Sequence, residues 1–153
     1  MSTINERLAE LGITLPVLAK PVAAYVPAVI SGNLVFTSGQ LPFVDGVLPE
    51  TGKLGAGVDA DAAAGYARQC ALNGLAAVES VIGSLDRVTR IVKVVGFVAS
   101  DPSFTGQPGV INGASNVLGE IFGDAGVHAR SAVGVAVLPL NSPVEVELVV
   151  EFA

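Results

Sequence analysis

Hydrophobic and polar residues alternate near the end of the sequence, from Val144 to Phe152, with Val149 as the one apolar residue at a polar position. Because successive side chains of a β-strand point to opposite faces, this period of two predicts a strand. The predicted apolar face carries Val144, Val146, Leu148, Val150 and Phe152, and the polar face carries Glu145, Glu147 and Glu151. We expect the apolar face to pack on the core. We expect Glu147 and Glu151 to be exposed to solvent, as is usual in antiparallel sheets.

A helical period marks the middle of the chain. Asp59 or Asp61 could cap the free N–H groups at the start of this helix, and Gly83 is a typical stop signal after Ile82. Apolar residues recur in steps of three and four, which places them on one helical face. This stripe consists of Ala64, Ala67, Ala71, Leu75, Val78 and Ile82. We expect the stripe to lie on a sheet.

The other elements are predicted from the same kinds of signal. In chain order they are a short helix over 4–11, strands over 25–30 and 34–37, a strand over 90–99, a helix over 109–122 and a strand over 131–138. The turn signal Ser31-Gly32-Asn33 makes the first two strands a hairpin. The stretch from Pro42 to Gly57 is rich in turn signals and should be a surface connection with one short strand at most.

The composition fits one domain with more apolar surface than a single core needs. The chain has 153 residues, of which 51% are hydrophobic and 14% charged, and this argues against disorder. Its apolar runs stop well short of the ~20 residues that span a bilayer, so we expect subunit contacts and not a membrane. Residues 1–22 are interpreted as an N-terminal extension with a short helix, part of the same domain as residues 23–153.

The charged residues limit which binding partners and which cellular location we expect for the protein. The formal net charge is −6, and no basic stripe is present that could displace counterions from a phosphate backbone, so a nucleic-acid partner is not expected. The N-terminal residues mix charged and apolar side chains and lack the basic start and apolar core of a secretory signal. We therefore expect a cytoplasmic protein.

Several common catalytic arrangements are missing from the sequence. There is one histidine, His128, without a nucleophile or acid at a known motif spacing, and we expect it to be a solvated loop residue. The single cysteine, Cys70, has no neighbours at metal-binding spacing and should be a core residue. We expect no bound metal. Metal-free ribonucleases commonly use two groups that titrate near neutrality, so ribonuclease activity is disfavoured.

Three segments together resemble the RidA/YjgF family, also known by the older label endoribonuclease L-PSP. They are 24–27 (AYVP), 32–42 (GNLVFTSGQLP) and 129–139 (ARSAVGVAVLP), the last followed by 144–147 (VEVE). The order and separation of these motifs match the family from Tyr25 to the C-terminus. The N-terminal extension marks a divergent subgroup.

The resemblance implies an α+β, chorismate-mutase-like fold, in which a mixed β-sheet carries two main helices on one face. It also implies a homotrimer with active clefts between subunits, which would cover the surplus apolar surface. The best-known members of the family hydrolyse reactive 2-imino acids to 2-keto acids and ammonia, without a cofactor.

The catalytic residues implied by the resemblance are Arg130 and Glu145. Arg130 corresponds to the arginine that binds the substrate carboxylate, for which a guanidinium is well suited; the alternative is a surface arginine paired with a glutamate. Glu145 corresponds to the glutamate that holds or activates the attacking water; the alternative is an exposed strand residue.

Further residues are implied to bind substrate. Tyr25 would close the cleft from a neighbouring subunit, and Ser38 and Gly39 would line it, although each could equally be structural. Asn112 corresponds to a cleft asparagine, with Asn116 as a competitor. Ala132 replaces a cysteine that is frequent in the family, and its backbone N–H could still serve the site.

The expected function is therefore hydrolytic deamination of 2-imino or enamino acids, of the 2-iminobutanoate/2-iminopropanoate type. The alternative is a trimeric, non-catalytic binding protein for small carboxylates. Retention of both Arg130 and Glu145 favours the enzyme, because a carboxylate sensor needs only the arginine.

Overall fold

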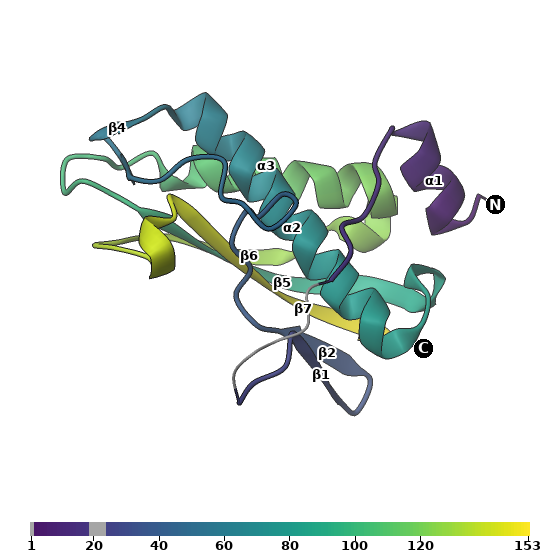
Figure 1. Cartoon of the computed structure of the whole chain (residues 1–153). Helices are drawn as coiled ribbons and strands as arrows, with labels where there is room; N and C mark the ends of the chain where they lie inside the picture. Colours follow the sequence, from purple (N-terminus) through teal and green to yellow (C-terminus); the bar gives the residue numbers. More distant parts are fainter. Residues whose placement is uncertain (1, 19–23) are drawn as a thin grey trace.

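One mixed β-sheet with two long helices on one of its faces forms the body of the chain (Figure 1). The structure is a computed structural model and describes residues 2–18 and 24–153. Its helices are α1 (Ile4–Glu10), α2 (Ala60–Ile82) and α3 (Gln107–Phe122), with short 3-10 turns η1 (Leu85–Arg87), η2 (Gly123–Gly126) and η3 (Pro139–Asn141). Its strands are β1 (Ala28–Ser31), β2 (Leu34–Thr37), β3 (Lys53–Leu54), β4 (Gly57–Val58), β5 (Val88–Ala99), β6 (Ala129–Val135) and β7 (Val144–Phe152). The predicted α+β class, with two main helices on one face, is confirmed.

The five-stranded sheet has the order β1-β2-β7-β5-β6. The pairs β1–β2, β2–β7 and β5–β7 are antiparallel, whereas β5 and β6 run parallel. A parallel pair needs a long connection between its strands, and α3 lies in that connection. This topology makes β6 an edge strand that lies beside α3, and it leaves β7 near the middle of the sheet.

The alternation in β7 is confirmed. Val144, Val146, Leu148 and Val150 are buried under the helices. The glutamates that alternate with them are half-buried, not exposed as we expected for Glu147 and Glu151. Because β7 has a strand on each side, its neighbours shield both faces; Thr89 Oγ1 also donates a hydrogen bond of 2.7 Å to Glu151.

Helix α2 begins and ends where its capping signals predict. Asp59 is the N-cap, and its side chain accepts from the N–H of Ala62 at 3.0 Å. Gly83 is the C-cap. Five residues of the predicted stripe, Ala67, Ala71, Leu75, Val78 and Ile82, are buried, whereas Ala64 is half-buried and lies beside Gly113 of α3. Cys70 is buried on the same helix, as expected for a core cysteine.

Three further predictions can be compared with the structure. The short helix α1 and the β1–β2 hairpin are present. Strand β6 ends at Val135 and not at Leu138, because β5 ends at Ala99, which is the partner of Val135, and a strand cannot continue without a partner. The connection after Pro42 holds two strands of two residues each, β3 and β4, where one was expected.

Within residues 2–18 and 24–153, no helix is long and apolar enough to cross a membrane.

Candidate active site

The residues predicted to form the site lie in two separate places. Arg130, Asn112 and Ala132 lie where β6 passes α3, at one edge of the sheet. Tyr25, Gly39 and Glu145 line a separate cavity near the start of β7, the middle strand of the sheet. We call the first place the Arg130 cluster, which consists of Arg130, Asn112, Ser115 and His128, and the second the Glu145 pocket.

Helix α3 holds the guanidinium of Arg130. One of its terminal nitrogens, Nη1, donates to Asn112 Oδ1 at 2.7 Å and to Ser115 Oγ at 3.2 Å. Asn112 and Ser115 are three residues apart on α3 and therefore share a helical face. The sequence left two asparagines as candidates. Asn112, and not Asn116, contacts Arg130.

Arg130 has no carboxylate partner in the described part of the chain, where the ion pair found is Arg7 with Glu10. Within this single described chain, no glutamate pairs with Arg130, as the alternative of a surface ion pair would require. Two acceptors use both hydrogens of Nη1. The hydrogens of Nε and Nη2 have no acceptor among the described residues and can bind a ligand. These two nitrogens form a side-on fork that matches the two oxygens of a carboxylate.

The expectation of a solvated His128 is wrong. The ring is half-buried, and both of its nitrogens have partners: Nε2 lies 2.8 Å from Ser115 Oγ, and Nδ1 lies 2.6 Å from the carbonyl oxygen of Gly126. Ser115 and His128 are thus cluster members that sequence reasoning missed. A weak signal existed, because His128 precedes Arg130 by two residues and so can share its side of the chain.

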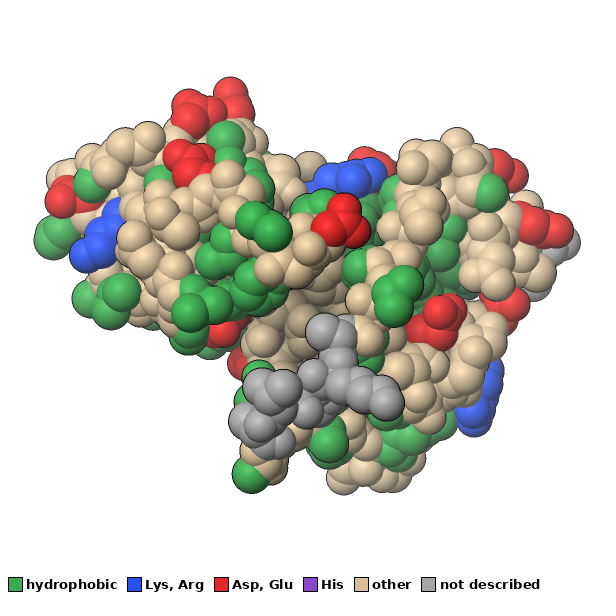
Figure 2. Space-filling view, viewed as in Figure 1, with side chains coloured by type: hydrophobic (Ala, Val, Ile, Leu, Met, Phe, Trp, Pro, Cys, Tyr) green, Lys and Arg blue, Asp and Glu red, His purple; other side chains and the backbone are tan. Residues whose placement is uncertain are grey.

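The Glu145 pocket is a cavity of about 1040 Å³. Its walls come from the segment 14–18, the segment 39–46, helix α2 and the turn η3. Many of its side chains are apolar, among them Leu15, Val17, Leu41, Phe43 and Leu140. Figure 2 shows one face of the molecule, hollowed near its middle and bordered there by hydrophobic side chains. The pocket therefore has room for a ligand with an apolar part.

Gly39 and Glu145 are in close contact inside this pocket. A Cβ atom on Gly39 would lie only 2.8 Å from Cδ of Glu145, so only glycine fits beside the carboxyl group as it now lies. The preceding residue anchors this loop, since Ser38 Oγ donates to the carbonyl of Val26 at 2.6 Å and its N–H donates to that of Pro27 at 2.8 Å. Ser38 therefore shapes the loop, whereas Tyr25, which is 61% exposed, borders the cavity.

The carboxyl group of Glu145 is partly desolvated. Burial is the main cause that raises its pKa above the usual value, and the charge of Glu147 raises it further. The described residues provide no hydrogen-bond donor to this carboxylate. An unpaired carboxyl group with a raised pKa is suited to take up and release a proton.

A single chain does not bring Arg130 and Glu145 together. Arg130 is paired with Val94 on β5, which is paired with Leu148 on β7, so Glu145 lies three residues along and two strands away. At about 3.3 Å per residue and about 4.8 Å per strand, their Cα atoms are roughly 14 Å apart. Their side chains also point to different faces, because Glu145 alternates with the buried residues of β7 while Arg130 points to α3.

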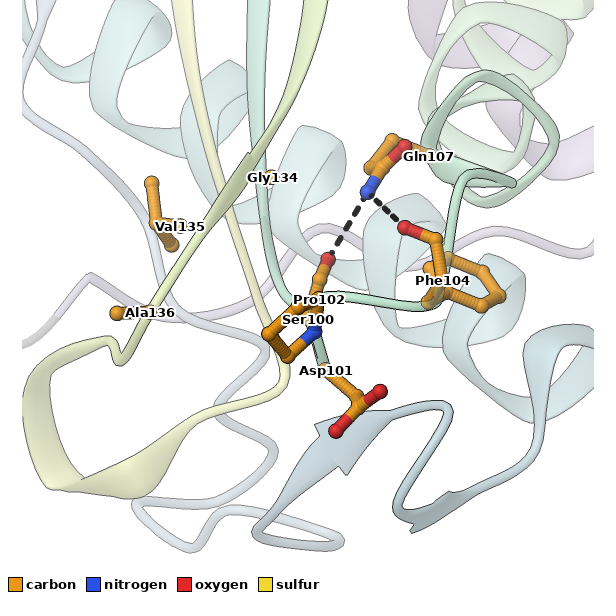
Figure 3. Close-up of a pocket in the computed structure, with 8 residues that line it drawn as sticks. All are labelled: Ser100, Asp101, Pro102, Phe104, Gln107, Gly134, Val135 and Ala136. Carbon is orange, nitrogen blue, oxygen red and sulfur yellow. Dashed lines mark hydrogen bonds between the residues drawn. The ribbon is translucent and has the colours of Figure 1, made fainter.

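A second, smaller cavity of about 310 Å³ lies farther along β6 (Figure 3). Gln107 at the start of α3 donates there to Ser100 Oγ at 3.2 Å and to the carbonyl of Phe104 at 2.8 Å. None of the predicted site residues lines this cavity. Ala132 lies on β6 between this cavity and Arg130. Its side chain is half-buried and packs against the core.

Among the described residues, no group of three or more His, Cys, Asp and Glu side chains is placed to hold a metal ion.

Comparisons with known proteins cover nearly the whole chain. The family model described as "YjgF/chorismate mutase-like, putative endoribonuclease" matches residues 5–152. Protein TCP17 of Trypanosoma cruzi is 47% identical over 149 residues, which is 97% of this chain and 93% of the relative.

Two other matches bear on activity and on fold. A Dermatophagoides farinae protein named 2-iminobutanoate/2-iminopropanoate deaminase is 33% identical over 138 residues, 90% of this chain and 93% of the relative. The crystal structure of an Agrobacterium tumefaciens protein of unknown function is 48% identical, with a TM-score of 0.91, and the match covers 98% of this chain and 92% of that one.

Proposed function

The chain belongs to the YjgF/chorismate-mutase-like family, and from this premise we propose that it hydrolyses 2-imino acids to 2-keto acids and ammonia. The observation that carries the proposal is the guanidinium of Arg130, which α3 holds in place while two of its nitrogens lack a carboxylate partner in the described chain. A 2-imino acid offers a carboxylate to that fork. The name of the mite relative supports the same reaction class.

In the proposed reaction, Arg130 binds the carboxylate and thereby places the neighbouring C=N carbon. Glu145 accepts a proton from a water molecule as the water oxygen bonds to this carbon of the protonated imine, which forms a neutral tetrahedral carbinolamine. Glu145 then passes that proton to the amino nitrogen. As the C–N bond breaks, the hydroxyl group gives its proton back to Glu145, the C=O bond forms, and ammonia leaves and takes up this proton as ammonium. Its raised pKa makes the Glu145 carboxylate a stronger base than an exposed glutamate, which favours the first transfer.

Because one chain separates the two residues, the proposal includes a cleft between copies of the chain. Each cleft would combine the Arg130 cluster of one copy with the Glu145 pocket of the next. A ring of copies related by rotation provides such contacts, and the expected homotrimer is one of these rings.

The uncovered face of the sheet supports this assembly. It carries the apolar residues Val29, Phe36 and Val133, which are 50%, 42% and 45% exposed. These residues lie on the face opposite the helices. Across the sheet they are in register with Val149 and Glu145 of β7, which alternate with the buried residues of that strand. An exposed apolar sheet face of this kind is typical of a protein interface.

The test is an imine assay. 2-Iminopropanoate and a bulkier imino acid such as that of phenylalanine are generated by an amino-acid oxidase, and the surviving imine is trapped with semicarbazide. The wild-type protein is compared with Arg130→Ala and Glu145→Gln, and with Arg68→Ala, which removes an arginine of α2 that belongs to neither region and does not lie on the uncovered sheet face. We expect the wild type and Arg68→Ala to deplete the imine, and the two site variants to fail.

Two other results would support a different function. If the folded wild type depletes no imino acid but binds 2-oxobutanoate in an Arg130-dependent way, the chain is a carboxylate-binding protein and the deaminase proposal is wrong. Cleavage of RNA that is lost at high salt, without imine depletion, would instead support the activity in the family's description.

A further inference from the structure

The Arg130 cluster contains two residues without a part in the proposed reaction. Ser115 accepts from Arg130 Nη1 at 3.2 Å, and its Oγ lies 2.8 Å from Nε2 of His128. The other ring nitrogen, Nδ1, lies 2.6 Å from the carbonyl oxygen of Gly126. A continuous row of hydrogen bonds therefore runs from the guanidinium through a hydroxyl and a ring to the backbone.

The chemistry of the groups sets the direction of each bond. A carbonyl oxygen can only accept, so Nδ1 of His128 must carry a hydrogen. In the neutral ring Nε2 is then an acceptor, and the hydroxyl of Ser115 donates to it. This orientation turns the lone pairs of Ser115 Oγ toward Arg130, whose N–H donates to them.

The far end of the row is rigid. Gly126 is buried at the end of η2, and a Cβ atom there would lie 2.4 Å from the carbonyl oxygen of Leu118 on α3. This close approach fixes the backbone that receives Nδ1–H of His128. The ring, the hydroxyl and the guanidinium are thus aligned from a packed part of the fold.

We propose that His128 and Ser115 are positioning residues that hold the Arg130 guanidinium in the orientation that receives a substrate carboxylate. The role in catalysis rests on the proposed function of Arg130. His128 orients the Ser115 hydroxyl, Ser115 and Asn112 together engage both hydrogens of Nη1, and the Nε–Nη2 edge stays free and stationary. A fork held in this way loses less side-chain freedom when a carboxylate binds.

Four variants separate this role from simple packing. His128→Phe keeps an aromatic ring but removes both nitrogens, and Ser115→Ala removes the hydroxyl. His128→Gln is the conservative variant, because its amide oxygen can accept from Ser115. Asn116→Ala is the matched control, since Asn116 is exposed on the same helix beside Ser115.

The first readout needs no ligand. The ¹⁵N spectrum of the arginine side chains reports rotation of the guanidinium about its Cζ–Nε bond, which slows when Nη1 is held. We expect slow rotation for Arg130 in the wild type, His128→Gln and Asn116→Ala, and fast rotation in His128→Phe and Ser115→Ala. Equal, slow rotation in all folded variants would overturn the positioning role.

The second readout is affinity for a stable carboxylate, 2-oxobutanoate, measured by calorimetry. We expect His128→Phe and Ser115→Ala to bind it about tenfold more weakly, as for the loss of a hydrogen bond to a charged group, and His128→Gln to recover most of this. In the imine assay, the same two variants should raise KM by a similar factor with little change in kcat. Normal KM with a lower kcat would contradict the proposal.

The two proposals fail in different ways. If rotation changes as expected but the wild type binds no carboxylate, the function proposed for Arg130 is wrong and with it the catalytic part of this inference. If the wild type binds carboxylate through Arg130 but rotation and affinity do not respond to His128→Phe, the inference alone is wrong.

Discussion

The Arg130 cluster and the Glu145 pocket are built in different ways. In the cluster, an arginine is held by Asn112 and Ser115, and the serine is held in turn by His128, through hydrogen bonds of 2.7 to 3.2 Å. In the pocket, a glutamate lies beside Gly39 in a cavity of about 1040 Å³ with many apolar walls, and its carboxylate has no hydrogen-bond donor among the described residues.

This difference fits a division of tasks. A binding group gains from being held still, because less freedom is lost when the ligand arrives. A group that exchanges protons gains from a partly dry site that moves its pKa toward neutrality, as burial does for Glu145. If the two regions divide binding and proton transfer in this way, variants of the two regions should change different measured quantities.

Arg130→Ala should have the largest effect, because it removes the carboxylate fork. We expect kcat/KM for imino acids to fall by about 100-fold or more, in line with the ~3 kcal/mol that is lost with a charged hydrogen-bonding partner. Arg130→Lys should recover only a small part, since an ammonium cannot form the paired contact. Steady-state imine kinetics measure both; a loss below threefold in Arg130→Ala would show that the cluster does not bind substrate.

A mixture of two inactive proteins should regain activity. If each site combines Arg130 of one copy with Glu145 of the next, random co-assembly of Arg130→Ala with Glu145→Gln leaves about one site in four intact. We therefore expect close to a quarter of wild-type activity after the two variants are unfolded and refolded together. Variants refolded separately and mixed only for the assay are the control. Failure to recover activity in co-assembled oligomers would place both residues in one copy.

Gly39→Ala should disturb the pocket without disturbing the cluster. The added Cβ would meet Cδ of Glu145 at 2.8 Å, so the carboxyl group has to move by several tenths of an ångström. We expect about tenfold lower kcat, because small misplacements of a catalytic group are costly, and little change in affinity for 2-oxobutanoate. Gly65→Ala is the control, since its added Cβ would meet nothing within 4 Å apart from its chain neighbours and the nearby backbone of its own helix. An unchanged kcat would separate Glu145 from the chemistry.

Glu145→Gln should have the smallest effect, on stability. Because the folded state raises the pKa of Glu145, the folded protein binds the proton more tightly than the unfolded chain, and the ionised carboxylate costs stability above that pKa. The variant should thus be more stable at pH 7, by less than about 1 kcal/mol since solvent screens a half-buried group. Thermal unfolding from pH 4 to 8 tests this: the difference should shrink as pH falls toward the ordinary value of 4.5. A difference independent of pH would contradict the desolvation of Glu145.

The sequence by itself determined most of the local structure. The period of two in β7, the capping residues Asp59 and Gly83 of α2, and the hairpin around Gly32 were all readable, because each depends on residues close together in the chain. The same is true of the family motifs that carry Arg130 and Glu145, which are contiguous stretches. The predictions were wrong where a residue distant in sequence sets the local structure. Strand β6, for example, ends at Val135 because its partner strand β5 ends at Ala99.

The tertiary structure decided which side chains meet. That Asn112 and not Asn116 holds Arg130, and that His128 is hydrogen-bonded through Ser115, depends on how α3 lies against β6. That one chain keeps Arg130 away from Glu145 depends on the strand order and register of the sheet. Strand order and helix packing join residues far apart in sequence, and the local patterns that specify each element carry no information on that pairing.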